Sequence, residues 1–403
     1  MPQGLSAARL AHMDRVFATK YVETGKLAGT CTLVARHGEV VHTGVTGMMD
    51  RERGKPMRED TIFRIYSMTK PITSAAFMML VEEGRVALDE PVHKYIPEWR
   101  DLGVFVAGIP GAFQTRRPAR PMLIVDLLRH TSGLTYGFQT RTNVDAAYRK
   151  LSIGTIEKSP VSLDEMIASL AKTPLEFSPG EAWNYSVSTD VLGYLVEKIS
   201  GLEFEEFLQE RIFGPLNMAD TGFHVPREKA ERFAACYSFD ASGKNVVLQD
   251  DPAKSEYLKP PTFVSGGGGL VGTAQDYLQF CKMLANGGTL NGQRFLSRKT
   301  IELMRMNHLP GGRQLMEMSR SLFSEAGNEG LGFGLGFAVV LDRAATMTAG
   351  SVGEYFWGGA ASTAFWIDPV EDVIAIFMTQ FIPSSTYPVR RDMRTMVYAA
   401  MEE

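Results

Sequence analysis

Cysteine is scarce in this chain. Three cysteines are scattered among 403 residues, at Cys31, Cys236 and Cys281. An odd, low number of cysteines gives no disulfide framework and is typical of a reducing compartment. No cysteine has metal-ligand spacing to another cysteine or to one of the seven dispersed histidines. The sequence therefore predicts no metal site and no cofactor.

Long apolar runs are missing as well. No stretch approaches the roughly 20 apolar residues that a membrane-spanning helix needs. Residues 1–21 lack the uninterrupted apolar core of a secretory signal and have the pattern of an amphipathic helix, with Leu10, Met13 and Phe17 on one side. We expect a cytoplasmic protein without a membrane partner. A chain that had lost its leader would have the same pattern.

An excess of positive charge is also absent. The chain has 42 Lys and Arg against 46 Asp and Glu, which gives a net charge of −4. Since no basic block or stripe occurs, we expect no nucleic-acid partner. The hydrophobic fraction of 44% is that of an ordinary soluble globular protein, and the length suits two domains or one domain with a large insertion. These features do not decide whether the chain forms a homo-oligomer.

The most informative stretch that is present runs from Ser67 to Lys70. A serine hydroxyl is a poor nucleophile at neutral pH and needs a nearby base. A lysine three residues later lies on the same face of a helix, so its amine can meet the serine oxygen if the serine opens that helix. Residues 61–66 have the pattern of a strand, and residues 72–81 form an apolar run of helical length that stops at Gly84. This context favours a catalytic Ser67 at a strand-to-helix turn.

A second copy of the same spacing shows that the motif alone is weak. Ser169 and Lys172 are also three residues apart. Here the serine lies inside a helical pattern over residues 162–172, the lysine sits in its last turn, and Pro174 follows. We interpret this copy as structural, because a motif takes its meaning from its context.

Strand patterns occur at both ends of the chain and helical patterns between them. The expected strands cover residues 29–34, 39–45, 334–341, 362–367 and 373–379, and the expected helices cover residues 123–129, 163–171, 189–199, 204–211 and 389–401. We expect an α+β fold in which both ends of the chain build one sheet. One domain would comprise residues 1–90 and 265–403. Residues 91–264 would form a mainly helical inserted domain, with the active site in the cleft between the two.

Two glycine-rich segments fall outside these elements. Residues 104–121 are rich in Gly, Pro and Arg and predict a surface loop that either shapes an entrance or forms a contact. Residues 266–269 are four glycines in a row, which permits close backbone approach or a hinge. No phosphate-loop lysine follows them.

Three further segments stand in an order known from one group of proteins. Residues 130–134 read His-Thr-Ser-Gly-Leu, residues 177–186 form a loop ending in a Tyr-Ser pair, and residues 357–360 read Trp-Gly-Gly-Ala. Together with the motif at residues 67–70, they resemble the serine β-lactamase and penicillin-binding-protein superfamily, and most closely its carboxylesterase branch, the family VIII esterases. The resemblance implies a β-lactamase/transpeptidase-like fold, with an antiparallel sheet flanked by helices and an inserted helical region.

The resemblance also implies a catalytic set. Ser67 would be the acylated nucleophile, with Lys70 as the base or as the charge that favours a phenolate at Tyr185. The backbone amides of Ser67 and Ala360 would form the oxyanion hole. His130 is expected to be a buried, hydrogen-bonded residue that holds its loop.

Other residues of these segments would surround the substrate. Gly358 and Gly359 would let an edge strand approach it without obstruction by side chains. Trp357 would line the site. Tyr136 and Phe138 either line the acyl pocket or pack within their loop.

Two departures separate the chain from β-lactamases. Class C β-lactamases and many transpeptidases carry an asparagine two residues after the tyrosine or serine of this motif, where this chain has Val187. They also carry a lysine or histidine at the position of Trp357, and an indole cannot pair with the carboxylate of a penicillin as that cation does. No Gly-x-Ser-x-Gly elbow occurs that would support an α/β-hydrolase instead.

The leading hypothesis is a carboxylesterase that hydrolyses neutral, short- to medium-chain esters through an acyl-enzyme on Ser67. The same residues would serve an acyltransferase, in which an alcohol replaces water. A weak β-lactamase activity is a third alternative. A non-catalytic binding module of the same fold is disfavoured, because Ser67, Lys70 and Tyr185 are all retained.

Overall fold

The largest sheet of the molecule is built from both ends of the chain. The computed structural model describes residues 2–156, 159–320 and 328–402. Eight strands lie in the order β12-β13-β14-β15-β16-β1-β2-β3, and all neighbouring pairs are antiparallel. Their bounds are β1 Gly29–Arg36, β2 Glu39–Asp50, β3 Lys55–Pro56, β12 Leu331–Phe333, β13 Ala338–Val340, β14 Tyr355–Gly358, β15 Ala364–Asp368 and β16 Val373–Met378. Because β1 pairs with β16, the expected sheet from both chain ends is confirmed.

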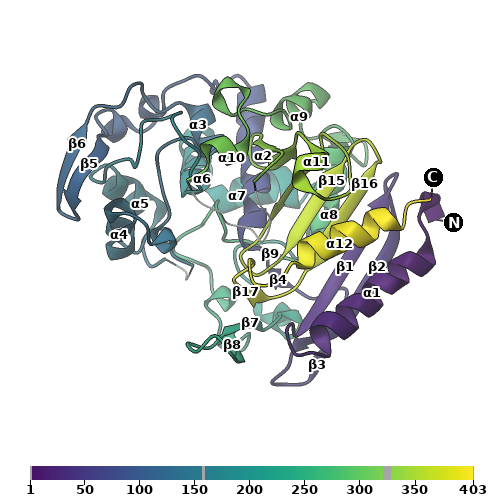
Figure 1. The fold of residues 1–403 in the computed structure, drawn as a ribbon. Coiled ribbons are helices and arrows are strands. Elements are labelled where there is room, and N and C mark those ends of the chain that lie inside the picture. Colours follow the sequence, from purple (N-terminus) through teal and green to yellow (C-terminus); the bar gives the residue numbers. More distant parts are fainter. Residues whose placement is uncertain (1, 157–158, 321–327, 403) are drawn as a thin grey trace.

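Helices cover both faces of this sheet. On one face lie α1 (Ala7–Phe17) and α12 (Val389–Ala399), which run side by side in Figure 1. On the other face lie α2 (Thr69–Glu82) and α8 (Ala274–Ala285). Every residue of β1 and β16 is buried, as expected for strands covered on both sides.

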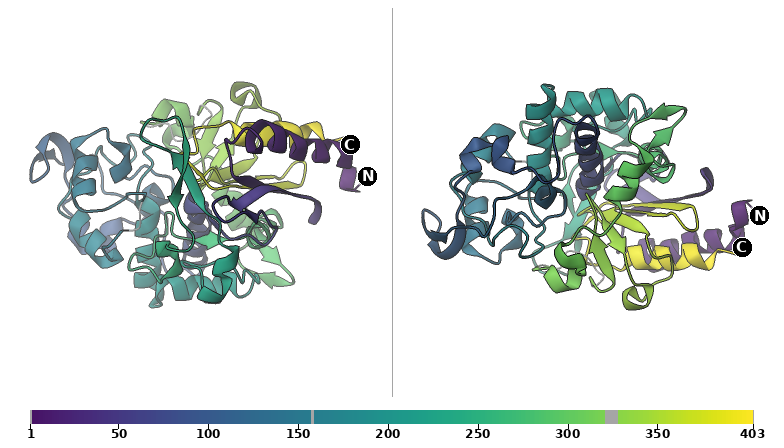
Figure 2. Two further views of the ribbon diagram at one scale, coloured as in Figure 1. Left: turned by 90° about the horizontal axis from the view of Figure 1, so that it is seen from below. Right: turned by 90° about the horizontal axis from the view of Figure 1, so that it is seen from above.

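The remaining helices lie between α2 and α8 or between α8 and α12 in the sequence. They are α3 Ile124–Leu128, α4 Asn143–Lys150, α5 Leu163–Leu170, α6 Ser188–Ser200, α7 Phe204–Leu208, α9 Arg298–Met304, α10 Leu315–Met318 and α11 Arg343–Thr346. Both views of Figure 2 place the region of α3 to α5 beside the sheet rather than on it. No helix in the described ranges is long and apolar enough to cross a membrane.

The expected surface loop over residues 104–121 is wrong. Residues Val104–Ile109 and Ala112–Arg116 form a hairpin, β5 and β6, which projects from the molecule in Figure 1. Gly111 supplies the positive φ of 97° that its tight turn needs. A bulge between Phe105 and Ala107 breaks the alternation that would reveal a strand in the sequence.

Two expected strands also differ from the observed ones. Residues 334–341 do not form one strand, because Gly336 has φ 106° and separates β12 from β13. Within residues 61–66 only Phe63–Arg64 forms a strand, β4, which pairs with β9 (Val271–Gly272) outside the large sheet, and Ile62 before it makes a single bridge to Phe233. The chain then bends at Tyr66, whose φ of 43° is incompatible with a strand.

Small sheets complete the fold. Strand β17 (Phe381–Ile382) pairs with β7 (Cys236–Phe239), which pairs with β8 (Val246–Asp250), and β10 (Thr289–Leu290) pairs with β11 (Gln293–Arg294). The pairing of β7 with β17 joins the two expected domains across their boundary. The division into residues 91–264 and the rest stays a prediction.

Candidate active site

Ser67 lies where the sequence places it, at the start of a helix. A short 3-10 turn over Tyr66–Met68 leads directly into α2. The positive φ of Tyr66 is rare for a residue with a side chain, and such strain is common beside functional groups. Ser67 is half-buried and lines a cavity, whereas Lys70, one turn into the helix, is 1% exposed. The amine of Lys70 donates a hydrogen bond of 3.1 Å to Ser67 Oγ.

Three groups surround the amine of Lys70 in addition to the serine. Its Nζ donates a 2.6 Å hydrogen bond to the carbonyl of Gly267. It also lies 4.3 Å from the ring centroid of Tyr185 and 5.2 Å from that of Tyr136. Because aromatic faces attract a cation, the two rings help to hold a protonated amine close to Ser67.

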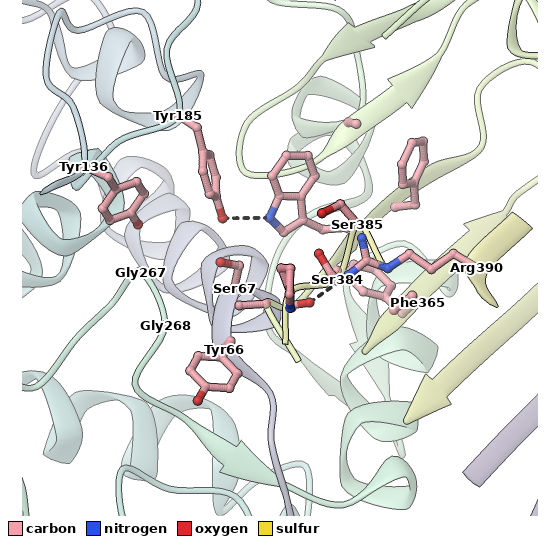
Figure 3. Close-up of a pocket in the computed structure, with 18 of the residues that line it drawn as sticks. Tyr66, Ser67, Tyr136, Tyr185, Gly267, Gly268, Phe365, Ser384, Ser385 and Arg390 are labelled. Carbon is pink, nitrogen blue, oxygen red and sulfur yellow. Dashed lines mark hydrogen bonds between the residues drawn. The ribbon is translucent and has the colours of Figure 1, made fainter. Parts of the chain in front are cut away.

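Tyr185 is held in the loop that precedes α6. Its side chain is 5% exposed, and its hydroxyl oxygen accepts a hydrogen bond of 3.4 Å from the indole nitrogen of Trp357 (Figure 3). The amide of Gln139 donates to its backbone carbonyl. The ring of His130 lies 5.0 Å from its ring. Sequence motifs separated by more than 170 residues therefore meet at one phenol oxygen.

His130 is buried and hydrogen-bonded, as expected. Its Nδ1 lies 3.2 Å from Ser186 Oγ. Burial, together with the charge of Lys70, holds the pKa of the His130 imidazole well below its usual range. A neutral imidazole is therefore part of the packing behind Tyr185 rather than a second cation beside Lys70.

The turn that follows β14 approaches the backbone in front of Ser67. A Cβ atom on Gly359 would lie 2.4 Å from the carbonyl oxygen of Ile65, so only glycine permits this approach. The Arg390 guanidinium donates to the carbonyl oxygens of Gly359 and Thr363, at 2.7 and 2.9 Å, and fixes the turn from α12.

Two backbone amides, one in this turn and one at Ser67, border the cavity. Among the described residues, the amides of Ser67 and Ala360 donate to no backbone or side-chain acceptor. Both residues line the cavity. Amides without an internal acceptor are available to an oxygen that develops negative charge.

Strand β14 is not an edge strand, contrary to expectation. It lies between β13 and β15. Its pairing with β13 covers only Tyr355 and Phe356, however. The two strands are antiparallel, and the first residue of β13, Ala338, lies opposite Phe356. Among the described residues, Trp357 and Gly358 consequently have no strand partner on that side, and this part of β14 borders the cavity.

A cavity of about 510 Å³ opens over Ser67. Tyr136 and Phe138 stack on each other at 4.7 Å between ring centroids, and both line it. Several other lining residues come from distant segments and were not predicted to line the site: Trp183, Asp190, Ser265, Gly267, Leu331, Ser384 and Arg390. No group of His, Cys, Asp and Glu side chains suited to a metal ion occurs in the described part of the chain.

The second serine-lysine copy has no such surroundings. Ser169 lies in the last turn of α5, and Lys172 is exposed beyond its end. Their link is a backbone hydrogen bond of 3.2 Å from the amide of Lys172 to the carbonyl of Ser169. Neither residue lines the cavity.

Known proteins match this chain over nearly its whole length. A family model described as Beta-lactamase matches residues 15–399. Protein Rv1367c of Mycobacterium tuberculosis (strain ATCC 25618 / H37Rv) is 37% identical over 365 residues, which are 90% of this chain and 88% of that protein. Esterase EstB of Burkholderia gladioli is 33% identical over 413 residues, covering 98% and 97% of the two chains. Among solved structures, "EstCE1, a hydrolase with promiscuous acyltransferase activity" is 27% identical, with a TM-score of 0.82 and coverage of 97% and 99%.

Proposed function

The chain belongs to the Beta-lactamase family, and from this premise we propose that it is a serine carboxylesterase of the family VIII branch. Its substrates would be short- to medium-chain carboxylic esters. The observation that carries the proposal is the hydrogen bond of 3.1 Å from Lys70 Nζ to Ser67 Oγ beneath a cavity of about 510 Å³. A base within hydrogen-bond reach is what a serine nucleophile needs.

In the acylation step, Ser67 Oγ bonds to the ester carbonyl carbon while its proton passes to Lys70 or Tyr185. The bond from the carbonyl carbon to the alcohol oxygen breaks, and the alcohol leaves with that proton. A free tyrosine titrates near pH 10, so Tyr185 can act near neutrality only with a cation close by, and the amine of Lys70 lies 4.3 Å from its ring. Lys70 and Tyr185 would therefore act together as one proton-handling pair.

Deacylation repeats the same chemistry with water. The water oxygen bonds to the acyl carbon and a water proton passes to the pair. The bond from the acyl carbon to Ser67 Oγ then breaks, and Ser67 Oγ takes that proton from the pair. In both steps the free amides of Ser67 and Ala360 would stabilise the negative charge on the carbonyl oxygen. Removing one such donor typically lowers kcat by a factor on the order of 100 to 1,000.

The site is suited to uncharged esters because an indole stands where related enzymes have a cation. Trp357 packs against Tyr185 and Phe333, with ring centroids 5.6 and 5.4 Å apart. Tyr136 and Phe138 extend the aromatic lining. An apolar acyl chain gains free energy by leaving water for such a surface, at roughly 25 cal/mol per Å².

Replacing Trp357 by lysine is expected to move selectivity toward a carboxylate-bearing cephalosporin. The ratio of kcat/KM for the cephalosporin to kcat/KM for a neutral aryl ester should rise about 5- to 30-fold, which corresponds to on the order of 1–2 kcal/mol. The gain is modest because an exposed charge pair is screened by water. The matched control is Trp357→Phe, which also loses the hydrogen bond to Tyr185 but gains no charge. Both variants must be measured across pH. Equal ratios in Trp357→Lys and Trp357→Phe at every pH would exclude this role for the missing cation.

An acyltransferase is the second candidate, since the solved neighbour EstCE1 is described as a hydrolase with promiscuous acyltransferase activity. The acyl-enzyme would be the same, and an alcohol oxygen would replace the water oxygen. A chain-length series of aryl esters, run beside a chromogenic cephalosporin and with or without an alcohol acceptor, separates these activities. Free acid as the main product at every alcohol concentration favours the esterase. A new ester as the main product favours the acyltransferase, and turnover of the cephalosporin alone would refute both.

We also propose a cytoplasmic location and an inserted domain over residues 91–264. A cytoplasmic location agrees with three cysteines that are buried, free thiols. Residues 91–264 as an inserted domain agree with the cavity lining, which takes Tyr136 and Trp183 from that segment and Ser67 and Trp357 from the rest.

A further inference from the structure

The four-glycine segment beside the catalytic lysine is anchored by a buried carboxylate. We propose that Asp190 is a positioning residue, which holds the loop of residues 265–269 so that the Gly267 carbonyl fixes the amine of Lys70 against Ser67. The inference rests on the proposed function, since it assigns to Lys70 a part in proton transfer. It adds a residue that acts through the loop and that does not belong to the serine-lysine-tyrosine set.

Asp190 reaches the loop from the first turn of α6. Its side chain is buried, at 2% exposure. Its Oδ1 accepts two hydrogen bonds, from Ser265 Oγ at 2.5 Å and from the backbone amide of Gly267 at 2.9 Å. One carboxylate oxygen thus ties both ends of a three-residue segment to the helix that follows Tyr185.

The opposite side of the loop is held by α2. Lys70 Nζ donates to the carbonyl of Gly267 at 2.6 Å, and Thr73 Oγ1 donates to the carbonyl of Gly266 at 2.8 Å. Farther along, the amide of Leu270 donates to Thr69 Oγ1 at 3.2 Å. The same peptide group of Gly266 and Gly267 therefore lies between the helix of the nucleophile and the helix of Asp190.

The lack of side chains in this segment is what permits the arrangement. A Cβ atom on Gly267 would lie 2.6 Å from Asp190 Oδ2 and 2.9 Å from the hydroxyl of Tyr136. A Cβ atom on Gly266 would lie 2.7 Å from the carbonyl oxygen of Thr189. The glycines expected from sequence to allow close backbone approach do so here, against the first turn of α6.

Asp190 is also the negatively charged group of the lysine's surroundings. The other titratable groups that face or act on Lys70 are Tyr136, Tyr185 and His130, from three loop segments. Burial raises the pKa of Asp190, while the hydrogen bond from Ser265 and the charge of Lys70 oppose that rise. The charge interaction between Asp190 and Lys70 is lost when the carboxylate becomes an amide, so this change should move the acid limb of the pH–activity profile to lower pH.

A second buried aspartate provides a matched control. Asp276 lies in the first turn of α8 at 8% exposure. Its Oδ2 accepts from one hydroxyl and one amide, those of Thr221 at 2.9 Å and Asp220 at 2.7 Å. Asp190→Asn and Asp276→Asn therefore remove the same charge from similar hydrogen-bond partners, and only the first touches the loop of Lys70.

The experiment measures kcat and KM of the full-length protein for an aryl ester from pH 5 to pH 9, with Tm of each variant. Asp190→Asn should lower kcat about tenfold with little change in KM, because small misplacements of a catalytic group cost this much or more. The acid limb of its kcat/KM profile should move about one pH unit lower. Asp276→Asn should lower Tm comparably and leave both kcat and the acid limb as in the natural protein.

The acid limb decides the outcome, because a purely structural role would not move it. An acid limb of Asp190→Asn that matches that of Asp276→Asn would overturn the proposal, whatever the loss in kcat. Ser67→Ala in the same series distinguishes a failure of the proposed function from a failure of the role of Asp190. If Ser67→Ala retains activity, the proposed function fails. If Ser67→Ala is inactive and the limb of Asp190→Asn is unmoved, only the role of Asp190 fails.

A milder pair of variants carries the test if Asp190→Asn does not fold. Ser265→Ala removes one of the two anchors, and Thr221→Val removes the corresponding partner of Asp276. Ser265→Ala should lower kcat about threefold at unchanged KM, in keeping with the loss of one hydrogen bond. Thr221→Val should leave both constants unchanged. Equal kcat values for the two variants would overturn the proposal.

Discussion

Replacing Ser67 by alanine is expected to reduce kcat/KM for an aryl ester by a factor on the order of 10,000 or more, because loss of a serine nucleophile in comparable hydrolases has effects of this size. Ser67 lies at the entrance of α2, lines the cavity and accepts a hydrogen bond from Lys70. No other serine has this combination among the residues that the structure describes. Steady-state kinetics with a short-chain nitrophenyl ester measures the loss.

The control for this variant is the other serine with the same spacing. Ser169→Ala should retain activity within about twofold, since surface and helix-end substitutions away from a site have small effects. The hydrogen bond between Ser169 and Lys172 joins backbone atoms, and Ser169 does not line the cavity. Equal activities of Ser67→Ala and Ser169→Ala would remove Ser67 as the nucleophile.

The second large effect is expected at the lysine and the tyrosine. Lys70→Ala and Tyr185→Phe should each lower kcat/KM on the order of 100-fold to 10,000-fold, as expected for loss of general acid-base catalysis. The double variant should be little worse than either single one, because residues that act as a unit have non-additive effects. The amine lies 4.3 Å from the centroid of the Tyr185 ring, so the two groups are direct neighbours beside Ser67. The measurement is kcat/KM of the natural protein, the two single variants and the double variant, which together form a double-mutant cycle.

Multiplicative losses in that double-mutant cycle would contradict the shared-proton mechanism. If the factors lost in Lys70→Ala and Tyr185→Phe multiply in the double variant, the two residues act independently and the shared-proton mechanism is wrong. Trp357→Phe is a useful companion, because it removes the hydrogen bond to the Tyr185 hydroxyl without removing either member of the pair.

Local patterns predicted the parts of the site that lie close together in sequence. Ser67 and Lys70 are one helical turn apart, so their spacing and the apolar run after them were enough to predict a serine that meets a lysine. The sheet from both ends of the chain followed in the same way from strand patterns with β-branched and aromatic residues, and β1 pairs with β16. Tyr185 and Trp357 required the resemblance to a known group of proteins.

Long-range contacts and unusual backbone angles could not be predicted in this way. Nothing in the sequence near Asp190 or Arg390 indicates that the first anchors a glycine loop and the second fixes the turn at Gly359. The strand expected before Ser67 is short because Tyr66 has a positive φ, a choice that tertiary packing imposes on a residue with a bulky side chain. The β5–β6 hairpin was missed because its bulge disturbs the two-residue alternation.

The position of β14 illustrates the same limit. The Trp-Gly-Gly segment was expected on an edge strand, yet β14 lies inside the sheet. The neighbouring strand β13 pairs with only Tyr355 and Phe356 of β14, so among the described residues the edge of β14 at Trp357 and Gly358 is unpaired and borders the cavity. Strand order depends on which distant segments pair, and a local pattern carries no information on that choice.

The central claim is an acyl-enzyme on Ser67, and peptide mass spectrometry after acid quenching tests it most directly. The protein is mixed with a nitrophenyl ester for a time shorter than one turnover, quenched in acid and digested. The account predicts that the peptide containing Ser67 gains the mass of the acyl group, that fragmentation places it on Ser67, and that Ser67→Ala shows no such peptide. An acyl group found on any other residue, Ser169 included, would contradict the account.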